Sequence, residues 1–349
     1  MPRSFHDTPV ILCLVLLALS AAVAGFAGDA AQRSLAEVLI RVVTVVGIYV
    51  FVGHSGVMSF GHVAFMGIGA YGVAWTSMEP SIKQYVLTGL PTWLQQAALP
   101  WLPATLLAGV LAALVAALAG AVILRLVGIA AAIATFALLA IFNVVYSNWD
   151  SVTAGTSSIV GIPTPVGVWQ ALAFACAAVW LAHAHARSGS GLALRAVREE
   201  PVAARSCGID AWKAQWIAFV LSAFVCGVAG ALDAQFLGVV NPDAYYLGRT
   251  FTCLAMLVIG GVASLSGAVT GVLAVSALIE LLVRLEKGVA VGAWLLQIPN
   301  GAQEVIVGLA MIGMLIRRPN GLLGHAELRW PSLGTTRPGG AEPGVQRTA

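Results

Sequence analysis

Long apolar segments without charged residues alternate with short polar stretches along the chain, and their lengths predict membrane helices. A helix needs about 20 apolar residues to cross the hydrocarbon core of a bilayer. Candidate spans lie at about residues 10–28, 36–53, 64–78, 101–124, 126–148, 166–186 and 214–232, with a further apolar segment at about 302–316. In the span at 101–124 we expect Ala112 to face lipid.

Residues 250–279 form a stretch of 30 positions without a charged side chain. This is too long for one upright helix, and the sequence GGVASLSG interrupts it near its middle. Glycine and serine weaken a helix, so we predict a hairpin of two short elements that enters and leaves the membrane. The expected fold class is therefore an all-α integral membrane protein with about ten membrane-crossing elements, some of them glycine-rich broken helices.

The composition supports a membrane protein. The chain is 59% hydrophobic and 9% charged, whereas soluble domains carry about 25% charged residues. The net charge of +3 is too small to indicate a nucleic-acid partner. The five cysteines, at positions 13, 176, 207, 226 and 253, include no CxxC pair, so we expect neither a disulfide framework nor a metal site.

Lysine and arginine predict the orientation, because positively charged loops remain on the cytoplasmic side. With both termini in the cytoplasm, twelve basic residues face inward and five face outward. Both termini can lie on the same side only if the hairpin at 250–283 crosses the membrane to the cytoplasmic side and crosses back. We expect a cytoplasmic N-terminus at 1–9, a membrane domain at 10–318 and a cytoplasmic tail at 319–349, whose Pro/Gly-rich end favours disorder.

Two glycine-rich breaks interrupt the apolar pattern. Residues 52–72 contain six glycines among 21 positions, and residues 260–271 repeat the order of apolar run, Gly/Ser break and apolar run. Small residues also permit close helix packing, which is the interpretation we favour for any single glycine. Taken together, the breaks favour a solute pathway, because broken helices in a membrane must face protein or a water-filled cavity. The pathway candidates are Ser59, Gly61, His62, Gly67, Gly69, Tyr71, Gly260, Gly261, Ser264 and Gly267.

The most charged part of the chain is the predicted cytoplasmic stretch 187–213. Leu194, Val197 and Val202 offer a small apolar face among its charged residues. Pro201 suits the first turn of a short helix, and Gly208 suits a C-terminal cap. The stretch is either a solvated loop or a docking element for a cytosolic partner.

These segments resemble the permease subunits of branched-chain amino acid ABC transporters, in particular the longer, M-type permease. The first signature of that family is similar to GHSGVMSFGHVAFMGIGAY at 53–71, and its cytoplasmic loop is similar to GLALRAVREEPVAARSCGI at 191–209. FVLSAFVCGVAGAL, NPD, VIGGVASLSGAVTG and RRPNGLLG extend the resemblance over about residues 36–325. The chain departs from the family at Tyr49, where asparagine is frequent, and in TAGTSSIVGIP at 153–163, where two glycines are lost.

The resemblance implies a transport subunit, without catalytic residues, in the bacterial inner membrane. It implies a second permease, two cytosolic ATPases and a periplasmic solute-binding protein as partners. The chain contains no GxxxxGK[ST] loop, so ATP would bind to the partner ATPases and this chain would need no cofactor. The loop would couple to the ATPase through Arg195, Arg198, Glu199, Ala203, Ala204 and Gly208. The departures leave the solute open among branched-chain amino acids, urea or short amides, and aromatic acids.

Two other classes of function remain to be weighed. Gly53-His54-Ser55-Gly56 matches the GxSG motif of rhomboid-type intramembrane proteases, in which Ser55 would be the nucleophile. A secondary transporter would need an ionisable residue within the membrane, for which Glu37, Arg41, Asp233 and Glu280 are candidates. All four lie near predicted span ends, so we expect their side chains to reach the interface.

Overall fold

The expected apolar spans form helices. The computed structural model of the chain describes residues 7–26, 28–126, 128–286, 289–291, 294–296, 299, 301–318, 321–324 and 327. The described part is mostly helical, which confirms the all-α class.

The longer helices are α1 (Asp7–Phe26), α2 (Asp29–Ser55), α3 (His62–Ser77), α6 (Trp101–Ile123), α7 (Ile129–Asn148), α9 (Val168–Arg187), α12 (Ala211–Leu237), α13 (Leu247–Gly260), α14 (Leu265–Glu286) and α15 (Ala302–Arg317). The short helices are α4 (Pro80–Val86), α5 (Thr92–Gln96), α8 (Asp150–Thr153), α10 (Gly189–Glu199), α11 (Pro201–Ser206) and η2 (Pro242–Tyr245). Strand β1 (Ile159–Val160) pairs antiparallel with β2 (Val239–Val240), and β3 (Val289–Val291) pairs antiparallel with β4 (Trp294–Leu296).

Seven helices among the described residues are long and apolar enough to cross a membrane, namely α1, α2, α6, α7, α9, α12 and α14. The chain is therefore a multi-pass membrane protein. Helices α3, α13 and α15 are shorter, with 16, 14 and 16 residues. The hairpin at 250–279 forms as α13 and α14, but α14 continues beyond Ile279 to Glu286 and is a full-length span rather than a short element.

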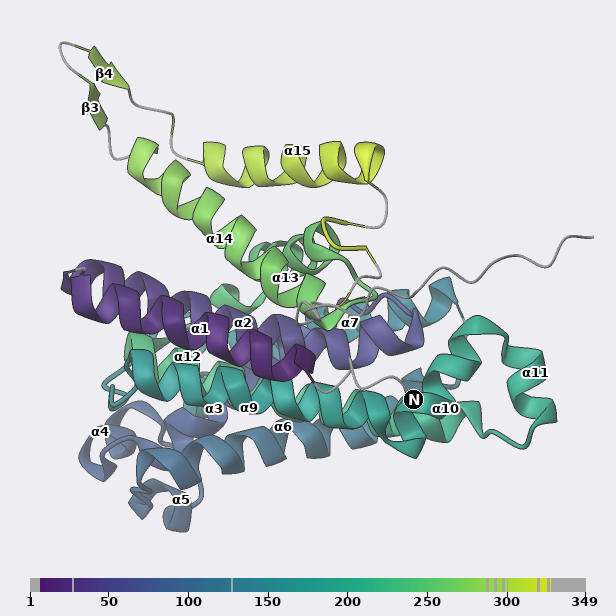
Figure 1. The fold of residues 1–349 in the computed structure, drawn as a ribbon. Coiled ribbons are helices and arrows are strands. Elements are labelled where there is room, and N and C mark those ends of the chain that lie inside the picture. The colour runs from purple at the N-terminus through teal and green to yellow at the C-terminus, as the bar shows by residue number, and fades with distance from the viewer. Residues whose placement is uncertain are drawn as a thin grey trace, which may run out of the picture.

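Helices α2 and α12 occupy the centre of the fold. Their most apolar windows are 83% and 78% buried, compared with 28% for α6 and 22% for α7. Helix α12 packs against α2, α3 and α6, and α9 packs against α1 and α2 (Figure 1). Large apolar side chains such as Leu118, Val122 and Ile129 point outward from α6 and α7, where a bilayer would cover them.

The expectation that Ala112 faces lipid is wrong. Ala112 is fully buried, and a Cβ at Gly227 of α12 would lie 2.5 Å from the Ala112 Cβ. Helix α6 therefore packs closely on α12 at this position. The face of α6 that packs inward carries small residues, and the face that points outward carries large aliphatic ones.

The two ends of the helical bundle differ in structure. Helices α4 and α5 lie at the left end in Figure 1, and α10 and α11 project at the right end. At the left end the ammonium of Lys83 is fully buried and donates to the carbonyl oxygens of Trp75 at 2.9 Å, Leu94 at 3.0 Å and Ala97. Burial lowers the pKa of this ammonium.

Three ion pairs involve the ionisable residues that sequence analysis singled out, and one of them is buried. Glu37 pairs with Arg41 in α2, and Glu280 pairs with Arg284 in α14. Asp233 is 2% exposed and pairs with Arg249 at 2.8 Å. The expectation that the Asp233 side chain reaches the interface is therefore wrong, because α13 turns back and brings a guanidinium to the carboxylate.

Candidate functional site

The first glycine-rich break separates α2 from α3. Gly56 adopts a left-handed conformation with φ 71°, and its N–H donates to the carbonyl of Val52 at 3.0 Å. The Ser55 hydroxyl accepts a hydrogen bond from the Val57 N–H at 3.1 Å, and the Phe60 N–H donates to the Thr135 hydroxyl at 3.2 Å. The non-helical residues 56–61 thus find polar partners for several backbone groups, as a break at membrane depth requires.

The hydroxyl of Ser55 therefore has a local structural role. His54, beside it in the GxSG match, turns its Nδ1 to the carbonyl oxygen of Val50 at 3.0 Å in its own helix. Serine and histidine of the motif are thus each engaged with the backbone near their own positions. This arrangement gives the protease interpretation no geometric support.

The second break separates α13 from α14. Gly261 has φ 125°, and the hydroxyl of Ser264 accepts a hydrogen bond from the Gly267 N–H at 2.9 Å. The carboxylate of Glu327 accepts from the N–H groups of Leu265 at 2.8 Å and Ser266 at 3.1 Å. A carboxylate at this position suits the first N–H groups of α14 and the positive end of its dipole.

Residues 321–323 and Glu327, which belong to the predicted tail, lie against this second break. The Leu322 N–H donates to the carbonyl of Ile259 at 2.8 Å, and the Leu323 N–H donates to that of Gly260 at 3.2 Å. A Cβ at Gly321 would lie 2.6 Å from the Gly261 Cα. The role of Glu327 was missed because no sequence signal links it to a turn about 60 positions earlier.

Helix α10, within the charged stretch 187–213, contacts the first break. Its N-terminus is capped by Ser188, whose hydroxyl accepts from the Gly191 N–H at 3.2 Å. Near its C-terminus, Arg198 Nη1 donates to the carbonyl oxygen of Gly53 at 2.6 Å. A Cβ at Gly56 would lie 3.1 Å from Arg198 Cγ, so the arginine stem lies directly over the turn.

Both breaks and α10 meet around one cavity of about 180 Å³. A Cβ at Gly53 would lie 2.8 Å from the carbonyl oxygen of Val262, which places the end of α2 against the second break. The lining residues from these segments are Tyr49, Gly53, His54, Arg195, Arg198, Ala263, Leu265 and Glu327. Two breaks more than 200 positions apart in the sequence are thus one structural unit.

The predicted pathway residues lie inside the helix packing, and none of the ten lines this cavity. A Cβ at Gly69 would overlap the carbonyl oxygen of Gly227, and one at Gly67 would overlap the Phe142 ring. A Cβ at Gly61 would lie 2.7 Å from the Thr135 carbonyl oxygen. These glycines permit close approach of helices, as do Gly260 and Gly267 between α13 and α14.

Three polar pathway candidates are buried among apolar groups. In the described part of the chain, the Ser59 hydroxyl, both ring nitrogens of His62 and the Tyr71 hydroxyl have no hydrogen-bond partner. The His62 ring instead packs beside Phe51 and Phe219, with centroids 5.5 and 5.4 Å away.

The coupling candidates fall on two faces of the α10–α11 element. Leu194, Val197 and Ala204 are buried, and Arg195 donates to the Ala186 carbonyl. Glu199, Ala203 and Gly208 are exposed, and Val202 is 72% exposed. Gly208 has φ 80°, which confirms the predicted cap, and its N–H donates to the carbonyl of Arg205 at 2.9 Å.

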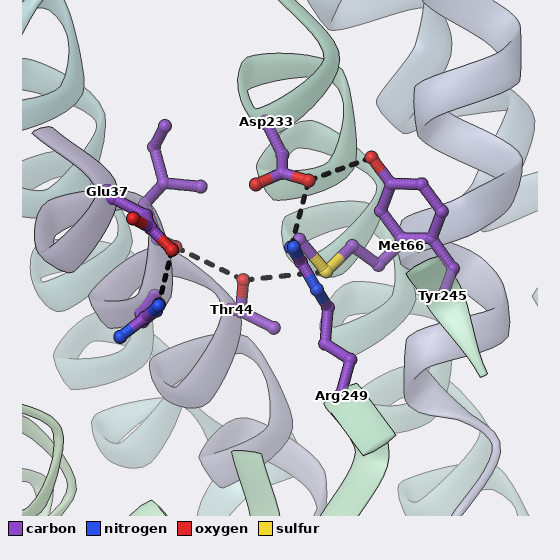
Figure 2. A network of polar contacts seen from close by, with 8 residues as sticks. Glu37, Thr44, Met66, Asp233, Tyr245 and Arg249 are labelled. Atoms are coloured by element: carbon purple, nitrogen blue, oxygen red, sulfur yellow. Dashed lines mark hydrogen bonds and ion pairs between the residues drawn. The ribbon is translucent and has the colours of Figure 1, made fainter. Parts of the chain in front are cut away.

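A polar network lies between α2, α3, α12, η2 and α13 (Figure 2). Asp233 Oδ2 accepts from the Tyr245 hydroxyl at 2.8 Å as well as from Arg249. The Arg249 guanidinium carbon lies 5.3 Å from the centre of the Tyr245 ring. The Thr44 hydroxyl lies 3.8 Å from the Met66 sulfur. The network has no sequence signature, because its members come from five separate elements, α2, α3, α12, η2 and α13.

Known proteins similar to the chain are membrane permeases. The family model described as branched-chain amino acid transport system / permease component matches residues 30–315. The high-affinity branched-chain amino acid transport system permease protein LivM of Escherichia coli K12 is 28% identical over 319 residues, covering 82% of this chain and 68% of LivM. LivM of Salmonella typhimurium LT2 is 26% identical with the same coverage. LivH of that strain, another permease protein, is 30% identical over 143 residues, covering 40% of this chain and 42% of LivH. No solved structure matches the chain.

Proposed function

Because the chain belongs to the family of permease components of branched-chain amino acid transport systems, we propose that it forms one half of the membrane pathway of an ABC importer. The solute is a branched-chain amino acid or a similar small polar solute. The second half is another permease, and the similarity of the chain to both LivM and LivH supports such a pair. The complex resides in the bacterial inner membrane.

The observation that carries this proposal is the junction of both helix breaks with α10. Arg198 links α10 to the end of α2, and Gly53 lies against Val262 of the second break. A displacement of α10 therefore reaches the ends of α2, α3, α13 and α14 directly. Such a junction suits a subunit whose helices are moved by conformational changes of a separate ATPase.

This ATPase is one of a cytosolic pair, to which ATP binds. The exposed face of α10 and α11, with Glu199, Val202, Ala203 and Gly208, is the docking surface for one of them. The chain itself contains no phosphate-binding GxxxxGK[ST] loop. Hydrolysis by this chain alone is therefore not expected.

The α10–α11 end is cytoplasmic in this proposal, because 187–213 carries Arg187, Arg195, Arg198, Arg205 and Lys213. The opposite end, with α4, α5 and the β1–β2 pair, faces a periplasmic solute-binding protein. Helices α3, α13 and α15 cross or enter the membrane together with the seven longer helices, which gives ten elements and cytoplasmic termini.

Reconstitution of the chain alone and with its partners tests the function. In liposomes, the chain alone should show neither solute uptake nor ATP hydrolysis, whereas the complete complex with loaded binding protein should take up leucine when ATP is supplied. Urea and an aromatic acid serve as alternative solutes in parallel assays. Uptake by the chain alone, driven by an ion gradient, would reject the importer and favour a secondary transporter.

A further inference from the structure

A second cavity, of about 330 Å³, lies between α2, α3, η2, α13 and α14. It is separate from the cavity at the helix breaks. Thr44 in its lining precedes Ser55 by eleven positions in α2, or roughly 16 Å along a helix axis. Its volume lies within the range of small-molecule sites, about 300–1,000 Å³. We propose that this cavity binds a zwitterionic aliphatic amino acid in transit, an inference that rests on the importer function proposed above.

The cationic side of the cavity suits a carboxylate. Arg41 and Arg249 both line it, and the side chain of each is 26% exposed. Each guanidinium uses one nitrogen for its pair with Glu37 or Asp233, respectively. A guanidinium has five N–H donors in a planar fork, so each retains donors for a second carboxylate.

The Arg249 guanidinium is held in place by its surroundings. Asp233 is 2% exposed and accepts from both Arg249 and the Tyr245 hydroxyl, and the Tyr245 ring lies beside the guanidinium (Figure 2). Because Asp233 balances one positive charge and Glu37 balances the other, the cavity does not require an anionic solute. Asp243 adds a carboxylate outside these two ion pairs, so the lining offers partners to a solute that carries both a carboxylate and an ammonium.

The other side of the cavity provides a carboxylate and an apolar surface. Asp243 lines it, and its Oδ1 accepts from the Asn143 amide at 3.2 Å, which orients the carboxylate and leaves acceptor capacity for an ammonium. Met66 and Met256 supply flexible thioether side chains that adapt to branched aliphatic groups. Urea has no carboxylate, no ammonium and no aliphatic side chain, so the lining favours an amino acid over urea.

Protection of a cysteine from labelling tests this site directly. Thr252 lines the cavity, and the variant Thr252→Cys in a Cys253→Ala background is assembled with the partner subunits, without binding protein. A small methanethiosulfonate reagent should label this position more slowly when excess leucine is present. Leucinamide, which lacks the carboxylate, and 4-methylpentanoate, which lacks the ammonium, should protect much less. The variant Ser81→Cys in the same background, at an exposed position of α4 away from the docking surface, is the control and should label at the same rate throughout.

A second variant tests the cationic side. Arg41→Gln should weaken leucine protection about tenfold, as expected for one charge-assisted hydrogen bond, while the partner subunits still co-purify. The inference is overturned if the unaltered complex takes up leucine but leucine does not protect position 252. It is also overturned if leucinamide protects as well as leucine, or if Arg41→Gln leaves protection unchanged. Failure of the unaltered complex to take up leucine, urea or the aromatic acid would instead reject the proposed function. Uptake of urea or the aromatic acid without uptake of leucine would overturn this inference alone.

Discussion

Arg198 Nη1 donates a hydrogen bond to the carbonyl oxygen of Gly53 at 2.6 Å, across 145 positions of sequence. Gly53 lies in the last turn of α2, where carbonyl groups lack partners within the helix. The arginine of α10 therefore completes the end of a central helix. This contact directly connects α10 to the membrane-spanning helix α2.

Replacing Arg198 with glutamine should uncouple hydrolysis from transport. A hydrogen bond to a charged group contributes about 1.5–3 kcal/mol, so its loss should reduce the stimulation of hydrolysis by loaded binding protein about tenfold or more. ATPase co-purification should persist, because Arg198 points toward the membrane domain. The matched control is Arg125→Gln, which removes an exposed charge from the α6–α7 connection. Unchanged stimulation in Arg198→Gln would show that the contact transmits nothing.

The docking surface is tested by two neighbouring alanines with different exposure. Ala203 is exposed and Ala204 is 5% exposed. Ala203→Glu should abolish co-purification of the ATPase while the permease keeps its thermal stability. Ala204→Glu should instead lower the unfolding temperature, because a carboxylate would enter the packed side of α11. Equal ATPase association for Ala203→Glu and the unaltered chain would exclude this face as the docking surface.

Close helix packing at Gly69 makes it intolerant of side chains. A Cβ there would overlap the Gly227 carbonyl, which belongs to backbone and cannot rotate away. Gly69→Ala should therefore destabilise the protein by about 1–3 kcal/mol, and Gly69→Leu by more. Ala137→Leu on α7, at an exposed position, is the control and should be neutral. Detergent thermal-stability measurements would separate the two, and equal melting temperatures would contradict the observed packing.

Lys83 holds the end opposite α10. Lys83→Met would leave three carbonyl oxygens without their donor, and each unsatisfied buried group costs about 1–3 kcal/mol. We expect faster cleavage of 80–100 by an external protease and a lower unfolding temperature. Arg33→Met, which removes an exposed cation, should change neither. Resistance of the Lys83→Met variant to cleavage would mean that other contacts hold this region.

Span positions could be predicted because membrane crossing fixes helix length, and apolar length is visible in a sequence. The break near 260 and the Gly208 cap could be predicted because both need a backbone conformation with positive φ, which glycine adopts most readily. The inward face of α6 could be read only from residue size, because lipid and protein interior are both apolar. Small residues such as Ala112 mark the packed face, and large ones such as Leu118 mark the outward face. The Asp233–Arg249 pair and the Arg198–Gly53 contact could not be predicted, because they depend on how separate helices are placed.

The close packing of α3 on α12 has a consequence for how the subunit can move. A Cβ at Gly230 would overlap the Met66 carbonyl, just as one at Gly69 would overlap that of Gly227. With backbone against backbone at both points, neither helix can slide past the other without collision. Helices α3 and α12 are therefore expected to move together as one rigid body when the subunit changes conformation.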